Sequence, residues 1–227
     1  MNEWLFFDSR EELDRTLAST LAASLRSTLE QQSRGSLALS GGSTPRGMLR
    51  QLAGMALAWA RVDLSLVDER WVEPRDPDSN ERLLRENLLQ GPAASARFTG
   101  LKSPGDDIGH AAELASRRLA ALQQPFTAVV LGMGADGHTA SWFPQAANLA
   151  ALLDRQGQAR FAATEPVTAP HRRLTLTLAA VLNSHHIHLQ LTGADKRAVL
   201  ESAVPDSRPV ASILTQTRTP VTIWWAP

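Results

Sequence analysis

A glycine-rich run that contains one aspartate and one histidine carries the residue types best suited to chemistry. It reads LGMGADGHTASWFP and extends from Leu131 to Pro144. Asp136 precedes His138 by two residues, so a carboxylate can hold the imidazole in one tautomer while the other ring nitrogen faces a ligand. Glycine-rich turns after strands often receive phosphate groups, and an imidazole adds a group that can transfer a proton. The run therefore predicts a site where a ligand is bound and also reacted upon.

A second glycine-rich run is typical of a phosphate-binding loop. It reads SLALSGGSTP, where Ser36 to Leu39 predict a strand and Thr44 predicts the N-cap of a helix that starts at Pro45. The turn offers backbone amides, hydroxyl groups and the positive end of a helix dipole, which together suit a phosphate. Its candidate ligand residues are Gly41, Gly42, Ser43 and Thr44. The alternative is a tight turn that only starts a helix.

Cationic side chains at two further predicted strand ends can neutralise a bound anion. Arg70 lies in the run RVDLSLVDERWV, next to Asp68 and Glu69, and Lys196 lies in LTGADKRAVLE. Taken alone, each of these cations is more typical of a solvated surface. The roles of three other polar residues stay open between ligand binding and a structural or surface position: Asn80, Arg173 and Arg46.

Dinucleotide binding is an alternative for the first run, because it contains a literal G-x-G-x-x-G pattern. That pattern should lead directly into a long helix and then a strand that carries an acid about twenty residues on. Here His138 and the sequence WFP interrupt the run, and Asp154 lies in ALLDRQGQ, which is not a strand end. The sequence also lacks a G-x-S-x-G elbow and a P-loop lysine, which disfavours a serine hydrolase and a P-loop NTPase.

A metal site is the next alternative, because the run HHIH gathers three of the six histidines. His186 and His188 would share one face of a strand. The chain has no cysteine, and no carboxylate motif accompanies these histidines. Imidazoles that cover a sheet face and form hydrogen bonds are the favoured interpretation, so we expect neither a metal nor a cofactor.

Composition limits the classes of partner. The 227 residues include 23 basic and 23 acidic side chains, so no net field attracts nucleic acid or an anionic membrane. No apolar run approaches the roughly 18 residues of a membrane span, and the N-terminal apolar run is too short for a signal peptide. We therefore expect a soluble cytoplasmic protein, with one domain over residues 1–227, that binds a small molecule as a monomer or weak dimer.

Strands and helices alternate along the chain and must position these loops. Strands are predicted at Glu3–Phe7 and Ser36–Leu39, as one strand through RVDLSLVDERWV, and in TAVVLGMG, RRLTLTL, HHIHLQLTG and VTIWW. Helices are predicted from the Ser9/Glu12 capping box to about Gln32, from Pro45, from near Asp78 to Asn80, from about Asp107 to Gln123, and in ADKRAVLESA. This order predicts an α/β fold, an open, mostly parallel Rossmann-like sheet with helices on both faces. Ligands bind beyond the carboxyl ends of such strands, where four polar loops can meet.

Five segments make the sequence closely similar to the 6-phosphogluconolactonase family. They are LSGGSTP, VDERWVEPRDPDSNERLLRENLL, VVLGMGADGHTASWFP, RRLTLTLAAVLNS and LTGADKRAVLE. The resemblance implies hydrolysis of 6-phospho-D-glucono-1,5-lactone to 6-phospho-D-gluconate in the oxidative pentose phosphate pathway, without metal or cofactor. It also implies a fold shared with glucosamine-6-phosphate deaminase.

Lactone hydrolysis gives the candidate residues definite roles. His138 would take a proton from a water that attacks C1 and return it to the ring oxygen O5, with Asp136 orienting the imidazole. The phosphate would be held by the Gly41–Thr44 loop, Arg70 and Lys196, and the lactone carbonyl is the alternative ligand of Arg70. Asn80 and Arg173 are further candidates for substrate binding.

Two other functions remain as alternatives. In the deaminases of this fold, a glutamate stands immediately before the proline of the segment that matches DGHTASWFP, and it assists ring opening; this chain has Phe143 there. The difference favours lactone hydrolysis over an isomerase or deaminase. A sugar-phosphate-sensing effector domain is the second alternative, and the absence of a helix-turn-helix pattern disfavours it.

Overall fold

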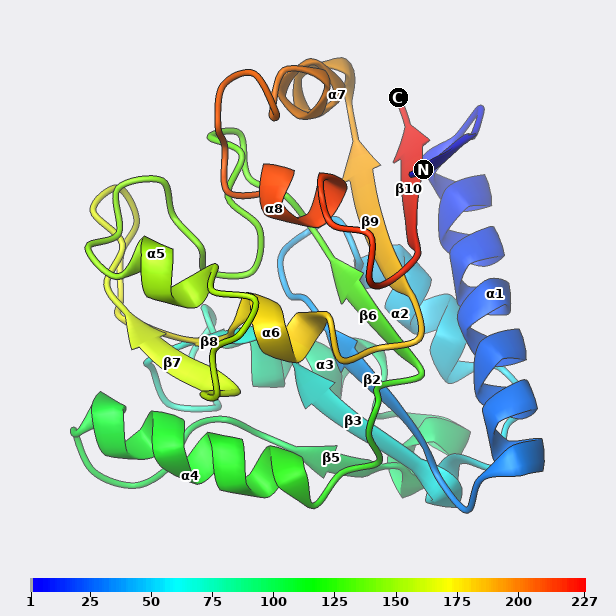
Figure 1. The fold of residues 1–227 in the computed structure, drawn as a ribbon. Helices are drawn as coiled ribbons and strands as arrows, with labels where there is room; N and C mark the ends of the chain where they lie inside the picture. Colours follow the sequence, from blue (N-terminus) through cyan, green and yellow to red (C-terminus); the bar gives the residue numbers. More distant parts are fainter. Residues whose placement is uncertain (1) are drawn as a thin grey trace.

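A seven-stranded sheet forms the centre of the computed structural model, which describes residues 2–227 (Figure 1). In spatial order its strands are β1 (Glu3–Phe6), β10 (Val221–Ala226), β9 (Ile187–Thr192), β6 (Ala128–Leu131), β2 (Gly35–Leu39), β3 (Val62–Leu66) and β5 (Arg97–Thr99). Every pair of neighbours in this sheet runs parallel. The predicted α/β fold with a mostly parallel sheet is confirmed.

A second, three-stranded antiparallel sheet was not predicted. It contains β4 (Asp68–Arg70), β8 (Arg173–Leu176) and β7 (Phe161–Thr164) in this order. The prediction of one strand through RVDLSLVDERWV is therefore wrong, because β3 and β4 belong to different sheets. Val67 separates them: its amide donates to Leu39 of the large sheet at 3.0 Å, and its carbonyl accepts from Leu176 of the small sheet at 2.8 Å.

Helices cover both sides of the large sheet, as predicted. In Figure 1, α1 (Arg10–Gln31) and α2 (Arg46–Ala53) lie on one side, and α6 (Leu178–Val181) with the small sheet lies on the other. The remaining helices are α3 (Asn80–Asn87), α4 (Ile108–Ala120), α5 (Leu149–Leu152), α7 (Ala194–Glu201) and α8 (Ala211–Leu214), with 3₁₀ turns at Trp59–Arg61 and Gly91–Ser95. No helix within residues 2–227 has the length and apolar character needed to cross a membrane.

Local sequence explains where α1 begins and which face it buries. Ser9 caps it, because its hydroxyl accepts a hydrogen bond from the Glu12 amide at 3.2 Å, as the capping box predicts. Leucines then recur one turn apart on the buried face: Leu13, Leu17, Leu21 and Leu25. This spacing packs the helix against the sheet along its length.

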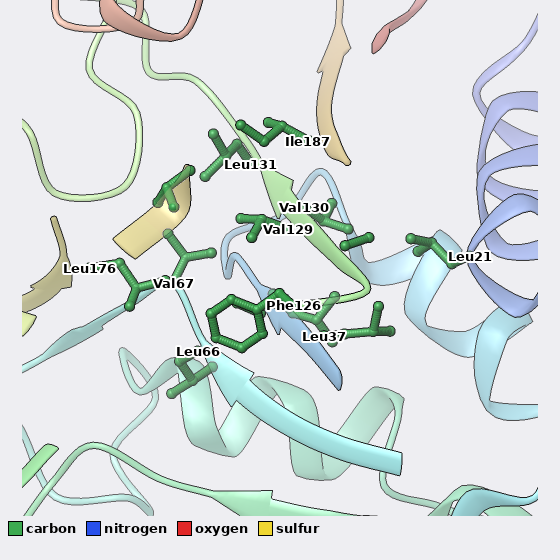
Figure 2. Packing of buried hydrophobic residues seen from close by; sticks show 14 of the residues in the cluster. Leu21, Leu37, Leu66, Val67, Phe126, Val129, Val130, Leu131, Leu176 and Ile187 are labelled. Carbon is green, nitrogen blue, oxygen red and sulfur yellow. The ribbon is translucent and has the colours of Figure 1, made fainter. Parts of the chain in front are cut away.

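The core lies between the sheet and its helices and holds the strands that carry the polar loops. Strands β2, β3 and β6 are buried at every residue, which is typical of parallel strands covered on both faces. Figure 2 shows part of this core, where Phe126 lies among Leu37, Leu66 and Val67. Rigid strands of this kind fix the loops at their carboxyl ends relative to one another.

Candidate active site

A cavity of about 220 Å³ lies where the loops after β2, β6 and β9 meet the β4 strand. Its lining consists of Ser40, Gly41, Gly42, Ser43, Thr44, Asp68, Arg70, Asn80, Gly132, Met133, Gly134, His138, Ala140 and Lys196. The structure thus brings together eight of the residues that the sequence singled out as candidate site residues: the Gly41–Thr44 loop, Arg70, Asn80, His138 and Lys196. Asp136 and Arg173 do not line the cavity.

His138 presents one free ring nitrogen. Its Nδ1 lies 2.6 Å from Oδ1 of Asp136, and the same oxygen accepts a hydrogen bond from the His138 amide at 3.1 Å. A carboxylate can only accept, so Nδ1 carries the proton and Nε2 is the unprotonated nitrogen. With about 29% of its side chain exposed, His138 can take a proton from a molecule in the cavity.

Two neighbours fix the plane of the imidazole. A Cβ atom at Gly134 would lie 2.2 Å from Cε1 of His138, so only glycine lets the ring approach this backbone. Phe143 stacks on the ring with 4.3 Å between the two centroids. Packing of the imidazole therefore explains Gly134. Gly137 has a separate reason, because its φ is +81° and an added Cβ atom there would lie 2.6 Å from Cδ of Arg208.

The Gly41–Thr44 loop offers unpaired backbone amides to the cavity. Ser40 makes the last ladder bond of β2, from its amide to the Val130 carbonyl at 3.1 Å. Beyond it, no backbone oxygen of residues 2–227 accepts from the amides of Gly41, Gly42, Ser43 or Thr44. Gly42 has φ of +92°, which L side chains rarely adopt, so the loop needs a glycine there. Consecutive free amides at a helix N-terminus suit an anion.

The prediction that Thr44 caps the following helix is wrong. Helix α2 begins one residue later, with Pro45 as its N-cap, and no side chain caps it from within the loop. The Asp14 carboxylate of α1 lies at the start of α2, next to Gly47. Burial raises the pKa of Asp14, and hydrogen bonds that include one from the Met48 amide oppose the rise. Because a distant acid occupies the start of α2, Thr44 is left to line the cavity.

Glu69 anchors the start of α3 to β4. Its carboxylate accepts hydrogen bonds from the amides of Arg70 at 2.8 Å, Asn80 at 2.7 Å and Glu81 at 2.8 Å, and from the Ser79 hydroxyl at 3.0 Å. Burial nevertheless raises the pKa of Glu69 to about 7. Enclosed by four donors and outside the cavity lining, this carboxylate holds Arg70 and Asn80 in place rather than facing a ligand.

Asn80 connects the Glu69 hydrogen bonds at the start of α3 to the Gly41–Thr44 loop. Its Nδ2 donates to the Asp68 carbonyl at 2.8 Å, and a Cβ atom at Gly41 would lie 1.8 Å from its Oδ1. The amide therefore fills the space where a side chain at Gly41 would stand. Asn80 presents little surface to the cavity, because only about 2% of the residue is accessible to solvent.

Gly41→Ala is expected to weaken phosphate binding by displacing Asn80 and the loop, and Gly41→Ala/Asn80→Ala is expected to recover part of that loss because the clash is gone. We expect a coupling of about 1–3 kcal/mol between the two positions. The measurement is calorimetric titration with inorganic phosphate. Gly54→Ala is the matched control, since an added Cβ there would meet its nearest atom, a backbone oxygen, at 3.7 Å. Equal losses in the single and double variants would contradict this account.

The two arginines of the small sheet have different positions. Arg70 lines the cavity, and its Nη1 donates to the Asp78 carbonyl. Arg173 pairs with it across the β4–β8 register but is buried, 6.0 Å from the Phe143 ring, with no partner for Nε or Nη1 within the described chain. Burial and the charge of Arg70 lower the pKa of Arg173. Arg173 therefore lies next to Phe143, the residue that stacks on His138, and does not line the cavity.

Asp68 is a lining residue that the sequence did not single out as a candidate. Its Oδ2 accepts from the Ser141 hydroxyl at 2.6 Å, and its place in the DER run beside Arg70 was the available signal. Lys196 faces the cavity from the first turn of α7, and burial, followed by the charge of Arg10, lowers its pKa. Arg46 is exposed on α2 and does not line the cavity.

The histidines of HHIH lie at the start of β9 and do not line the cavity. His186 and His188 each form a hydrogen bond through one ring nitrogen, and the buried Nε2 of His188 has no partner within the described residues. His186 and His188 stack with 4.5 Å between centroids; His186 bonds Thr222 at 2.8 Å, and Trp224 donates to His188 at 3.1 Å. Burial, with a smaller effect of His186, lowers the pKa of His188 to about 3. Among residues 2–227, no three histidine or carboxylate side chains are grouped to hold a metal ion.

Known proteins are similar to this chain in sequence and in fold. The family described as glucosamine-6-phosphate isomerases/6-phosphogluconolactonase matches residues 8–224. A 6-phosphogluconolactonase of Pseudomonas aeruginosa is 43% identical over 223 residues, which cover 96% of this chain and 92% of that protein. The crystal structure of a 6-phosphogluconolactonase from Shewanella baltica has a TM-score of 0.97 at 41% identity, over 100% of this chain and 98% of that one. A monomeric glucosamine-6-phosphate deaminase, 19% identical, shares the fold with a TM-score of 0.79 over 99% of this chain and 97% of that one.

Proposed function

The chain belongs to the family of glucosamine-6-phosphate isomerases and 6-phosphogluconolactonases, and from this premise we propose that it hydrolyses 6-phospho-D-glucono-1,5-lactone to 6-phospho-D-gluconate. The relatives named above carry the activity in their names, and the chain covers nearly all of their length. The reaction is the second step of the oxidative pentose phosphate pathway. We expect it to take place in the cytoplasm.

The observation that carries the mechanism is the free Nε2 of His138 beside a loop of unpaired amides. Nε2 takes a proton from a water molecule as the water oxygen attacks C1 of the lactone. The C1–O5 bond then breaks, and the imidazolium returns the proton to O5, which leaves a hydroxyl group and a new carboxyl group. Asp136 keeps the ring in the required tautomer and stabilises the imidazolium.

The phosphate group sets the distance between C1 and His138. The amides of the Gly41–Thr44 loop bind its oxygens, and Lys196 and Arg70 neutralise its charge from two other loops. Holding this remote group restricts the lactone to one orientation, which lowers the entropic part of the barrier. The cavity lining therefore separates into an anion-binding part and a proton-transfer part.

Phe143 disfavours the deaminase alternative. Ring opening in the related deaminases uses a glutamate at this position, whereas here an aromatic ring stacks on the imidazole at 4.3 Å. An apolar ring cannot transfer a proton, but it can keep His138 fixed. This contact supports hydrolysis over deamination.

The proposal is tested by following loss of the phosphorylated lactone at mildly acidic pH, where spontaneous opening is slow. We expect the protein to accelerate the loss well above this background and to release no ammonia from glucosamine 6-phosphate. Exhaustive chelation is expected to leave the rate unchanged. A rate equal to the background would contradict the proposal, and loss of activity on chelation with recovery in zinc or magnesium would contradict the metal-free mechanism.

A further inference from the structure

Arg10 holds the phosphate-binding loop from outside the cavity. It is the first residue of α1, and its Nη2 donates to the carbonyls of Ser43 at 2.6 Å and Thr44 at 3.0 Å. Both of those residues line the cavity, whereas Arg10 does not. No sequence pattern associates Arg10 with the site, because it lies 33 positions before Ser43 and 34 positions before Thr44.

The position of this arginine in its helix is unfavourable without such a contact. The N-terminus of a helix carries partial positive charge and favours acids, which Glu11 and Glu12 provide in the same turn. An arginine at the first position opposes that dipole. The two hydrogen bonds to loop carbonyls offset this unfavourable interaction with the dipole. Arg10 therefore stabilises the loop rather than the helix.

Peptide geometry links these contacts to the direction of the loop amides. In a trans peptide the C=O and the following N–H point in opposite directions. Fixing the Ser43 carbonyl toward Arg10 therefore turns the Thr44 amide away from Arg10. The Thr44 carbonyl precedes Pro45, which has no amide hydrogen, so that peptide can offer an anion only a repelling oxygen. Arg10 covers this oxygen.

The charge of Arg10 also acts on a residue of the cavity lining: burial is the larger cause that lowers the pKa of Lys196, and the charge of Arg10 is the second. We propose that Arg10 is a positioning residue for the phosphate group, which orients the Gly41–Thr44 loop and shields its carbonyl oxygens. The proposal rests on the proposed function for the identity of the phosphorylated ligand. It does not require Arg10 to touch the substrate.

The test compares Arg10→Gln with Arg26→Gln, a matched control on the same helix, where Nη2 of Arg26 donates to the Ala56 carbonyl at 3.2 Å. Calorimetric titration with inorganic phosphate and with 6-phosphogluconate is expected to show about tenfold weaker binding for Arg10→Gln, the effect of losing one strong charged interaction. Arg26→Gln should bind as the parent does. Arg10→Lys, which keeps the charge but not the planar fork, should recover part of the affinity.

Kinetics separate positioning from general stabilisation. For Arg10→Gln we expect a higher KM and a smaller fall in kcat, because the phosphate is held less firmly, while kcat/KM for unphosphorylated gluconolactone stays at the parent value. Unchanged phosphate affinity in folded Arg10→Gln or Arg10→Lys would overturn the inference, as would an equal loss in Arg26→Gln. Phosphate binding that depends on Arg10 in a protein without lactonase activity would instead overturn only the proposed function.

Discussion

Replacing His138 by asparagine is expected to lower the turnover of the phosphorylated lactone by about 10²- to 10⁴-fold, the usual contribution of a general base. An asparagine amide can still donate to Asp136, but it offers no basic nitrogen at the place of Nε2. Binding should survive, because the residues proposed to hold the phosphate lie on other loops of the cavity. The variant should therefore bind 6-phosphogluconate with an affinity close to that of the parent, measured by calorimetry, while its kcat collapses.

The control for this experiment is His110→Asn, which changes an exposed histidine outside the cavity lining and should leave turnover unchanged. Turnover of His138→Asn within about threefold of the parent would be too small an effect for a lost general base. The water would then have to be activated elsewhere. Asp136 and Asp68 would be the next candidates, whereas the four donors around Glu69 disfavour that carboxylate.

The fold could be predicted from the sequence wherever one local signal sufficed. The apolar run before the glycine motif became the buried parallel strand β6, and the Ser9 capping box started α1. The strands β5 and β7 were missed because RFT and FAAT are short and contain no valine-rich apolar run of the kind that marked the equally short β6. The break between β3 and β4 depends on Val67 bonding to two sheets at once, which no local pattern encodes.

The residues that line the candidate site could be predicted from the sequence, but the residues that hold them in place could not. Strand-end loops with glycine, histidine and cations indicated which residues would converge, and the structure places most of them around one cavity. The supports come from elsewhere in the chain: Asp14 at the start of α2, Arg10 on the loop carbonyls and Asn80 against Gly41. Each is a tertiary contact between separate elements, so spacing along the chain contained no signal for it.

Removing the phosphate from the substrate is expected to lower kcat/KM by at least about 10³-fold, because several charge-assisted hydrogen bonds of roughly 1.5–3 kcal/mol each are lost. Unphosphorylated gluconolactone retains the C1 centre on which we propose that His138 acts. The amides of the Gly41–Thr44 loop and the Lys196 cation would then have no partner. The comparison requires only the two lactones and the spontaneous rate of each. Comparable kcat/KM values for both would contradict the assignment of the substrate.

Lys196→Ala should reduce the ratio of kcat/KM between the phosphorylated and the unphosphorylated lactone. With one of the two cations gone, kcat/KM for the phosphorylated lactone is expected to fall about 10- to 100-fold, while the value for the unphosphorylated lactone changes little. Arg197→Ala is the matched control: Arg197 is the next residue of α7, and its guanidinium lies 5.1 Å from the Phe6 ring, outside the cavity lining. Because binding energy from a remote group is used to orient the reacting carbon, part of the Lys196→Ala loss should appear in kcat as well as in KM. A loss equal for both lactones would mean that Lys196 supports the fold or the reacting carbon, and the phosphate would then depend on Arg70 and the loop amides.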